Sequence, residues 1–144
     1  MPLIDALMRE VNASGFMSNR GRQIVACYLT LDLKQDWRWG AHHFEEVLID
    51  HDVQSNYASW AFASGMGPGR VLMFNTLKQS RDFDKNGHFI RMWVPELKDV
   101  PTEFIHEPWN MDISAQQKYG VIIGKDYPKP IQCPKYTDPN YQPK

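Results

Sequence analysis

Side chains that could bind a ligand or transfer an electron recur between Asp50 and Trp60. If residues 53–63 form a helix, Asp52, Asn56 and Trp60 lie one turn apart along one side of it. A buried carboxylate or amide without a hydrogen-bond partner costs about 1–3 kcal/mol. A ligand rich in donors and acceptors would supply those partners, with the indole stacked beside it. Alternatively, Asp50 or Asp52 caps the helix, Asn56 is exposed and Trp60 packs in the core, and the spacing alone favours this second interpretation.

The elements that carry these residues are all predicted to be helices. Apolar residues recur every three or four positions over residues 2–11, 18–33, 37–49, 53–63, 75–79 and 87–97, and residues 114–119 suit one short helix. Gly15 is predicted to end the first helix, Asp36 to cap the third, and Pro95 to break the one over 87–97 or form its last turn. No alternating strand pattern or internal repeat occurs. The sequence predicts an all-α fold, a multi-helix orthogonal bundle.

Composition and charge indicate a single globular domain or part of one. The chain has 144 residues, of which 42% are hydrophobic and 23% charged, and its net charge of −1 provides no global basic field for nucleic acid. Cys27 and Cys133 suggest neither a disulfide framework nor a zinc site, which favours a reducing compartment. The sequence lacks a run of transmembrane length and a signal-peptide pattern, so we expect no membrane association.

Two further motifs resemble ion or phosphate sites but lack a defining residue. Residues 82–87 match the first half of a calcium loop, yet Trp93 stands where a bidentate Glu is needed, so a turn that caps the next helix is favoured. The glycine-rich residues 65–70 lack the Lys-Ser/Thr ending of a P-loop, so we expect only a loop.

A metal site could be drawn from His42, Glu46 and Asp50, which are spaced four residues apart. No other helix offers matching histidines or carboxylates. We therefore predict a solvated helix face and no metal site.

Six segments follow one another along residues 2–131 in a recognisable order: 15–23, 36–40, 48–60, 89–97, 105–109 and 126–131. Together they resemble the photolyase/cryptochrome family. The resemblance implies the carboxyl-terminal part of an all-helical domain that binds FAD in a U shape. It assigns cofactor contacts to Arg22, Asp50, His51, Asp52 and Asn56. Within that set, Arg22 would pair with Asp50, and Asn56 would lie beside flavin N5.

The resemblance also assigns redox and DNA-facing residues. Trp37 and Trp60 match members of a tryptophan relay that brings electrons to photoexcited flavin. Asn19, Arg20, Gln23 and Phe62 match residues that face the lesion or the DNA backbone. Gln23, together with Phe62 in place of a lesion-stacking tryptophan, is similar to the cryptochrome-DASH branch, which is associated with pyrimidine dimers in single-stranded or looped DNA.

The implied function is light-driven repair of pyrimidine dimers by a lyase. A cryptochrome signalling module without repair is the alternative, and a flavin-free helical interaction domain is a third, which would leave the polar stripe without partners. We expect residues 1–131 to form part of the FAD domain and 132–144 a Pro-rich tail. By resemblance the antenna pigment binds a domain that the chain lacks, the intact protein is a monomer, and the chain alone binds FAD poorly. The sequence does not predict a cellular location.

Overall fold

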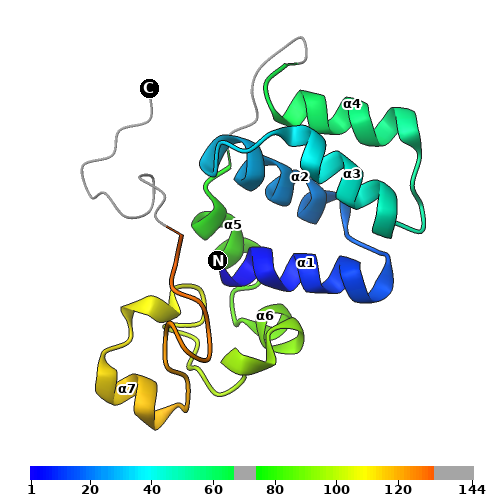
Figure 1. Cartoon of the computed structure of the whole chain (residues 1–144). Coiled ribbons are helices and arrows are strands. Elements are labelled where there is room, and N and C mark those ends of the chain that lie inside the picture. The colour runs from blue at the N-terminus through cyan, green and yellow to red at the C-terminus, as the bar shows by residue number, and fades with distance from the viewer. Residues whose placement is uncertain (67–73, 132–144) are drawn as a thin grey trace. The chain divides into compact units, whose positions relative to one another are not determined.

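The computed structural model describes residues 1–66 and 74–131 (Figure 1). Most of the predicted glycine-rich loop, the Pro-rich tail and Cys133 lie outside these residues. The helices are α1 (Pro2–Ser14), α2 (Asn19–Cys27), α3 (Trp37–Val47), α4 (Val53–Ala63), α5 (Thr76–Phe83), α6 (His88–Trp93) and α7 (Ile113–Lys118), with shorter turns η1 (Tyr28–Asp32), η2 (Pro95–Leu97) and η3 (Pro108–Asn110). The described residues form no strand beyond one isolated bridge between Ile123 and Tyr127. The all-α prediction is confirmed.

Helix ends follow the predicted capping residues. Gly15 has a φ of +69° and its amide bonds to the Val11 carbonyl, which ends α1. The Asp36 side chain accepts from the Arg38 amide and caps α3. Of the two candidates for α4, Asp52 is the cap, because its Oδ1 accepts from the Ser55 amide at 2.7 Å. These contacts are local in sequence, which is why the sequence could predict them.

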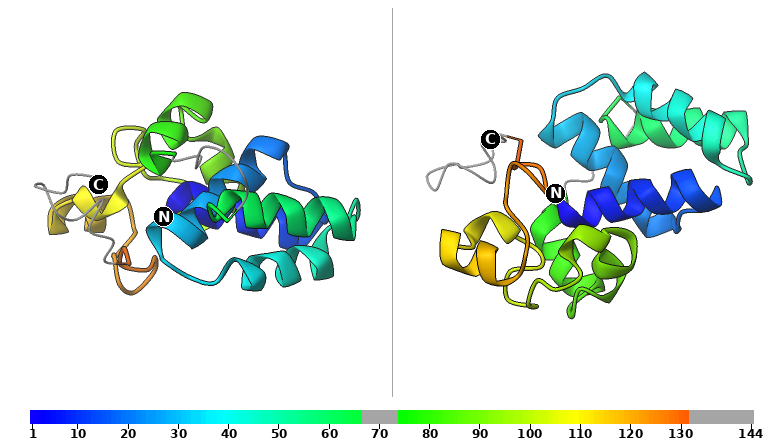
Figure 2. Two further views of the ribbon diagram at one scale, coloured as in Figure 1. Left: turned by 90° about the horizontal axis from the view of Figure 1, so that it is seen from above. Right: turned by 60° about the horizontal axis from the view of Figure 1, so that its bottom comes forward.

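The described residues divide into two compact units, and Glu10–Thr76 makes up most of the second. Within this unit α4 runs alongside α3 and also contacts α2 (Figures 1 and 2). Its core consists of buried apolar side chains on these helices: Ile24, Val25, Ala41, Phe44, Leu48 and Trp60. This packing places polar residues of α2 and α4 around one cavity, which is described below.

The other unit combines Met1–Arg9 with Leu77–Ile131. Its core draws on distant parts of the sequence, with Leu3, Leu7, Ile90, Leu97, Ile105 and Tyr127 all buried. The Arg9 guanidinium binds both carboxylate oxygens of Glu96, at 2.7 and 2.8 Å, and ties the two segments together. No helix in the described residues is long and apolar enough to cross a bilayer.

The expected helix over 18–33 changes character part-way. It is an α-helix up to Cys27 and then widens to a π-helical turn, in which the Leu33 amide reaches the Tyr28 carbonyl. Thr30 bonds back to the Ala26 carbonyl, a contact that bends helices. At residues 87–97 the α-helix stops at Trp93 and Pro95 opens η2, as the proline predicted.

The calcium-like segment is a capping turn. The buried Asp84 carboxylate accepts from the amides of Phe89 and Ile90, at 3.1 and 2.9 Å, at the start of α6. This confirms the prediction of a turn that caps the following helix.

The His42, Glu46 and Asp50 side chains are all exposed, and α3 ends before Asp50. The described residues contain no grouping of His, Cys, Asp or Glu suited to a metal ion.

Candidate functional site

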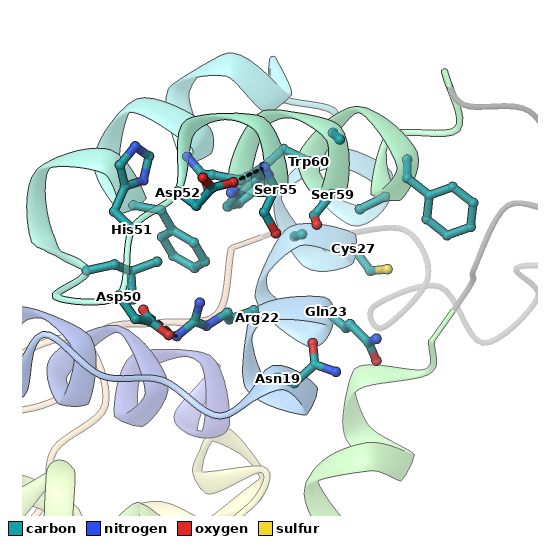
Figure 3. Close-up of a pocket in the computed structure, with 17 residues that line it drawn as sticks. Asn19, Arg22, Gln23, Cys27, Asp50, His51, Asp52, Ser55, Ser59 and Trp60 are labelled. Atoms are coloured by element: carbon teal, nitrogen blue, oxygen red, sulfur yellow. Dashed lines mark hydrogen bonds and ion pairs between the residues drawn. The ribbon is translucent and has the colours of Figure 1, made fainter.

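A cavity of about 490 Å³ opens between α2, α4 and the segment that joins α3 to α4 (Figure 3). Its size lies in the range of small-molecule sites. Polar side chains from α2 and from the Asp50–Asn56 region face apolar walls. The lining residues are Asn19, Arg22, Gln23, Ala26, Cys27, Phe44, Leu48, Asp50, His51, Asp52, Ser55, Asn56, Ala58, Ser59, Trp60, Phe62 and Ala63.

One side of the cavity carries a fixed ion pair. The Arg22 guanidinium binds both oxygens of Asp50, at 2.9 and 2.8 Å, while its Nε donates to the Met17 carbonyl at 2.8 Å. The Met17 carbonyl restrains the planar group, and Nη2, which contacts both oxygens of Asp50, orients the carboxylate. Because the Asp50 side chain is 53% exposed, the pair contributes little to stability, but its orientation toward the cavity is defined.

The stripe Asp52–Asn56–Trp60 lines the cavity, and each member also has a contact within the protein. Asp52 caps α4, the Asn56 amide donates to the Ala41 carbonyl at 2.9 Å, and Trp60 is 3% exposed in the core. The alternative interpretation is confirmed for the Asp52 cap and for buried Trp60, but Asn56 is half-buried and bonded, not exposed. Ligand binding by the stripe stays a prediction.

Trp60 forms the floor of the cavity through close packing. Its ring meets Phe44 edge-on at 5.1 Å between centroids, and it lies directly on Gly40. A Cβ added to Gly40 would come within 2.1–2.6 Å of the far edge of the indole. Only glycine at position 40 allows the indole to lie this close. The glycine is thus a signal in the sequence for this contact, and the prediction, which used the spacing of polar and aromatic residues, did not use it.

His51 lies between the two cavity aspartates, with its ring turned toward α3 (Figure 3). Both ring nitrogens are buried, and neither has a hydrogen-bond partner among the described residues. The nearest charge is the Glu45 carboxylate, 4.0 Å from Nε2. His51 thus lines the cavity, but its ring nitrogens face Glu45 on α3 and not the cavity.

The predicted DNA-facing residues fall in two places. Asn19, Gln23 and Phe62 line the cavity. Arg20 does not, since its guanidinium lies 5.3 Å from the centre of the Phe74 ring, in the geometry of a cation–π contact.

Trp37 lies outside the cavity at the start of α3. Its indole N–H donates to the Met66 sulfur at 3.2 Å, and its ring meets Tyr57 edge-on at 6.2 Å between centroids. The sequence did not single out Tyr57, nor Ser55 and Ser59, which line the cavity. The serines extend the polar side of α4 at a spacing of four residues, a pattern that could have revealed them.

Comparison with known proteins decides the family. Residues 1–137 match the family model described as the FAD binding domain of DNA photolyase. The chain belongs to this family.

Individual relatives agree with that assignment. Cryptochrome DASH of Synechocystis sp. is 50% identical over 131 residues, which cover 90% of this chain and 27% of the relative. Deoxyribodipyrimidine photo-lyase of Alkalihalophilus pseudofirmus is 46% identical, over 90% of this chain and 28% of the relative. The crystal structure of a Synechocystis sp. PCC6803 cryptochrome superposes with a TM-score of 0.85 at 50% identity and covers 90% of this chain and 27% of that one. The chain thus spans about a quarter of these relatives.

The cavity has the chemistry that a flavin requires. FAD combines flat rings, whose edges accept and donate hydrogen bonds, with a charged phosphate chain. Phe44 and Trp60 provide an apolar wall, and Arg22 presents a cation fixed by two contacts. Asn56 uses one amide hydrogen on the Ala41 carbonyl, which leaves its oxygen and second hydrogen free to bind a ligand. The residues present therefore fit the cofactor of the family.

Proposed function

We propose that this chain is the FAD-binding part of a flavoprotein that splits pyrimidine dimers in DNA under blue light. The observation that carries the proposal is the cavity itself, in which the Arg22–Asp50 pair and Asn56 face the apolar wall formed by Phe44 and Trp60. Membership of the family supports FAD as the ligand. When bound, FAD would supply the light-driven electron that opens the dimer.

The cavity residues would hold and polarise the cofactor. Arg22 places a cation beside the site, and Asp50 keeps that cation oriented while offsetting its charge. Such a pair suits an electron-rich ring, because the positive end stabilises added negative charge. Asn56 would offer its free amide hydrogen and oxygen to a ring edge, and Asp52 has one carboxylate oxygen beyond the one that caps α4.

Trp60 and Trp37 would carry electrons to the site. Trp60 forms the cavity floor, so its indole would touch a bound ring. Trp37 does not line the cavity, and its ring contacts Tyr57. Both indoles are oxidisable aromatic groups, which is the property that such a path requires.

The substrate side would be formed by Asn19, Gln23 and Phe62. The phenyl ring of Phe62 is 40% exposed and lines the cavity, so it could stack against an extruded base. A stacked base contributes about 1–3 kcal/mol, and a phenyl ring offers less area than an indole. A duplex target must also be unpaired, which costs a few kcal/mol more. We therefore propose a preference for dimers in single-stranded or looped DNA.

The test joins this chain to the amino-terminal part of the Synechocystis relative that precedes the matched region. Dimer reversal under blue light is measured on single-stranded and duplex oligonucleotides. Repair confined to single strands supports the proposal. Bound, photoreducible FAD without repair on either substrate would favour the signalling alternative, which the cryptochrome names of several relatives make the natural second candidate.

Two variants sharpen the test. Arg22→Lys keeps the charge but loses the second contact, from Nε to the Met17 carbonyl, that fixes the cation's position, so FAD affinity should fall. Arg81→Lys is the matched control, because Arg81 pairs with Glu107 at the surface and lines no part of the cavity. If both variants lost FAD equally, Arg22 would have no specific role in binding the cofactor.

A further inference from the structure

Tyr57 connects the proposed tryptophan relay to a cluster of acid–base groups. The residue lies on α4 and faces α3, where its ring meets Trp37 at 6.2 Å and 82°, an edge-to-face contact. On its other side the ring meets the His42 imidazole at 5.9 Å and 89°. A phenol is itself oxidisable, so the contact with Trp37 places a second redox-active ring beside the relay.

The phenol hydroxyl has a base in contact. It lies 2.8 Å from Oε2 of Glu45 and 3.2 Å from Nδ1 of His42. A carboxylate only accepts hydrogen bonds, so the single phenol proton points to Glu45, which leaves the phenol oxygen only an acceptor toward His42. The hydrogen bond to Glu45 raises the pKa of Tyr57. The phenol therefore keeps its proton at neutral pH, and its oxidation requires that proton to move.

Within residues 1–66 and 74–131, Trp37 has no comparable base. Its indole N–H donates to the Met66 sulfur at 3.2 Å, and a thioether is a weak acceptor that does not take up a proton at neutral pH. An oxidised Trp37 therefore remains a cation while this contact holds. The neighbouring ring, in contrast, has its proton acceptor already placed.

We propose that Tyr57 reduces oxidised Trp37 in a proton-coupled step, with Glu45 as the proton acceptor. One electron passes from the Tyr57 phenol to the indole radical cation of Trp37. The O–H proton passes to Oε2 of Glu45. The products are neutral Trp37, a neutral tyrosyl radical and protonated Glu45, so electrons, protons and charge balance. The proposal rests on the proposed function, in which photoexcited flavin is the oxidant that creates the Trp37 cation through the relay.

The step creates no new charge in the cluster. Before the step a cation and a carboxylate coexist in the cluster, and after it both groups are neutral. Glu45 is 42% exposed and can return its new proton to water. His51 lies 4.0 Å from the other oxygen of Glu45 and, in the part of the chain that the structure describes, is the further titratable group beside this carboxylate. The oxidising equivalent would thus come to rest on a half-buried phenol, where a reductant in solution could reach it.

A flavin-free experiment tests the step directly. The purified 144-residue chain is oxidised with photogenerated ruthenium(III) tris-bipyridine, and tryptophan and tyrosine radicals are followed by transient absorption. Every chain carries Trp39→Phe, because that indole is 67% exposed and would compete for the oxidant. Circular dichroism checks that each variant is folded.

The proposal expects a tyrosine radical to appear as the tryptophan radical decays. Tyr57→Phe should lose that coupled rise and prolong the tryptophan signal, and Trp37→Phe should also lose it. Tyr119→Phe is the control, because Tyr119 follows α7 in the other unit, and it should change neither the tyrosine rise nor the tryptophan decay. Glu45→Gln keeps an acceptor oxygen but cannot take the proton, so the transfer should slow at least roughly tenfold, or about 1.4 kcal/mol of activation free energy. Deuterated water should slow it as well.

An unchanged tryptophan decay in Tyr57→Phe would overturn the proposal. An unchanged rate in Glu45→Gln with slowing in His42→Gln would overturn the role of Glu45. Because no flavin takes part, the result is independent of repair. The two tests can give different answers. If the radical passes from Trp37 to Tyr57 in the flavin-free chain, but the joined protein binds no FAD, the proposed function is refuted and the Tyr57 step is not.

Discussion

A single methyl group at Gly40 should disturb the wall of the cavity. An added Cβ would lie 2.1, 2.4 and 2.6 Å from Cη2, Cζ3 and Cζ2 of Trp60. Non-bonded carbons prefer about 3.5–4.0 Å, so either the ring or α3 must shift by more than 1 Å. The indole cannot swing away freely, because it is 3% exposed and packed against Phe44.

The magnitude follows from two opposing effects. Overpacking a buried site costs about 1–3 kcal/mol. Exchanging Gly for Ala inside a helix raises the free energy of unfolding by about 0.5–1 kcal/mol. With a clash this close the cost should lie in the upper part of its range, so Gly40→Ala should lower the free energy of unfolding by about 1–2 kcal/mol.

The decisive variant is Trp60→Phe, because a phenyl ring does not extend to the three clashing atoms. In that background Gly40→Ala should stabilise the chain by about 0.5–1 kcal/mol through helix propensity alone. Urea unfolding of the four chains, followed by circular dichroism, measures the coupling between the two sites, which we expect at about 1.5–3 kcal/mol. Equal effects of Gly40→Ala in both backgrounds, or stabilisation in the presence of Trp60, would refute the reasoning.

Three further predictions concern the other unit. Asp84→Ala removes two hydrogen bonds to amides at the start of α6 and should cost about 0.5–2 kcal/mol in urea unfolding, whereas added Ca²⁺ should leave the wild-type melting temperature unchanged. Burial lowers the pKa of His106, which is neutral and bonded to Ser80 when folded, so stability should fall as pH drops below about 6.5, and His106→Asn should remove that dependence. The Arg9 hydrogen bonds lower the pKa of Glu96, so that pair's contribution is full above about pH 4.3 and lost in acid, and Glu96→Gln should flatten this part of a stability-against-pH curve.

Local signals in the sequence located the helices well. The bounds of α4 match the predicted 53–63, because Asp52 caps the helix from the residue next to it. Where a boundary depends on tertiary context the prediction was less accurate. The expected helix at 75–79 extends as α5 to Phe83, and the π-helical turn after Cys27 had no sequence signal.

The candidate site was predicted from the resemblance of several motifs, in their order along the chain, to a known family. Arg22 and Asp50 were paired by resemblance, and the structure places them in contact. Contacts across α3 and α4 had no such guide. Glu45 and Tyr57 are twelve residues apart, and neither stands out by type or by spacing. Only the packing of the two helices brings the phenol to its base.

The two interpretations of the stripe are compatible, because a side chain that bonds within the protein can still have atoms left for a ligand. Asn56 has two donor hydrogens and an acceptor oxygen, and the Ala41 carbonyl occupies one of the hydrogens. Asp52 caps α4 with one oxygen and has another. The structural bonds fix both side chains at the cavity wall, so a ligand that used the remaining atoms would cost little further side-chain entropy. If the cavity binds FAD as proposed, the residues that shape this helix would then also contact the cofactor.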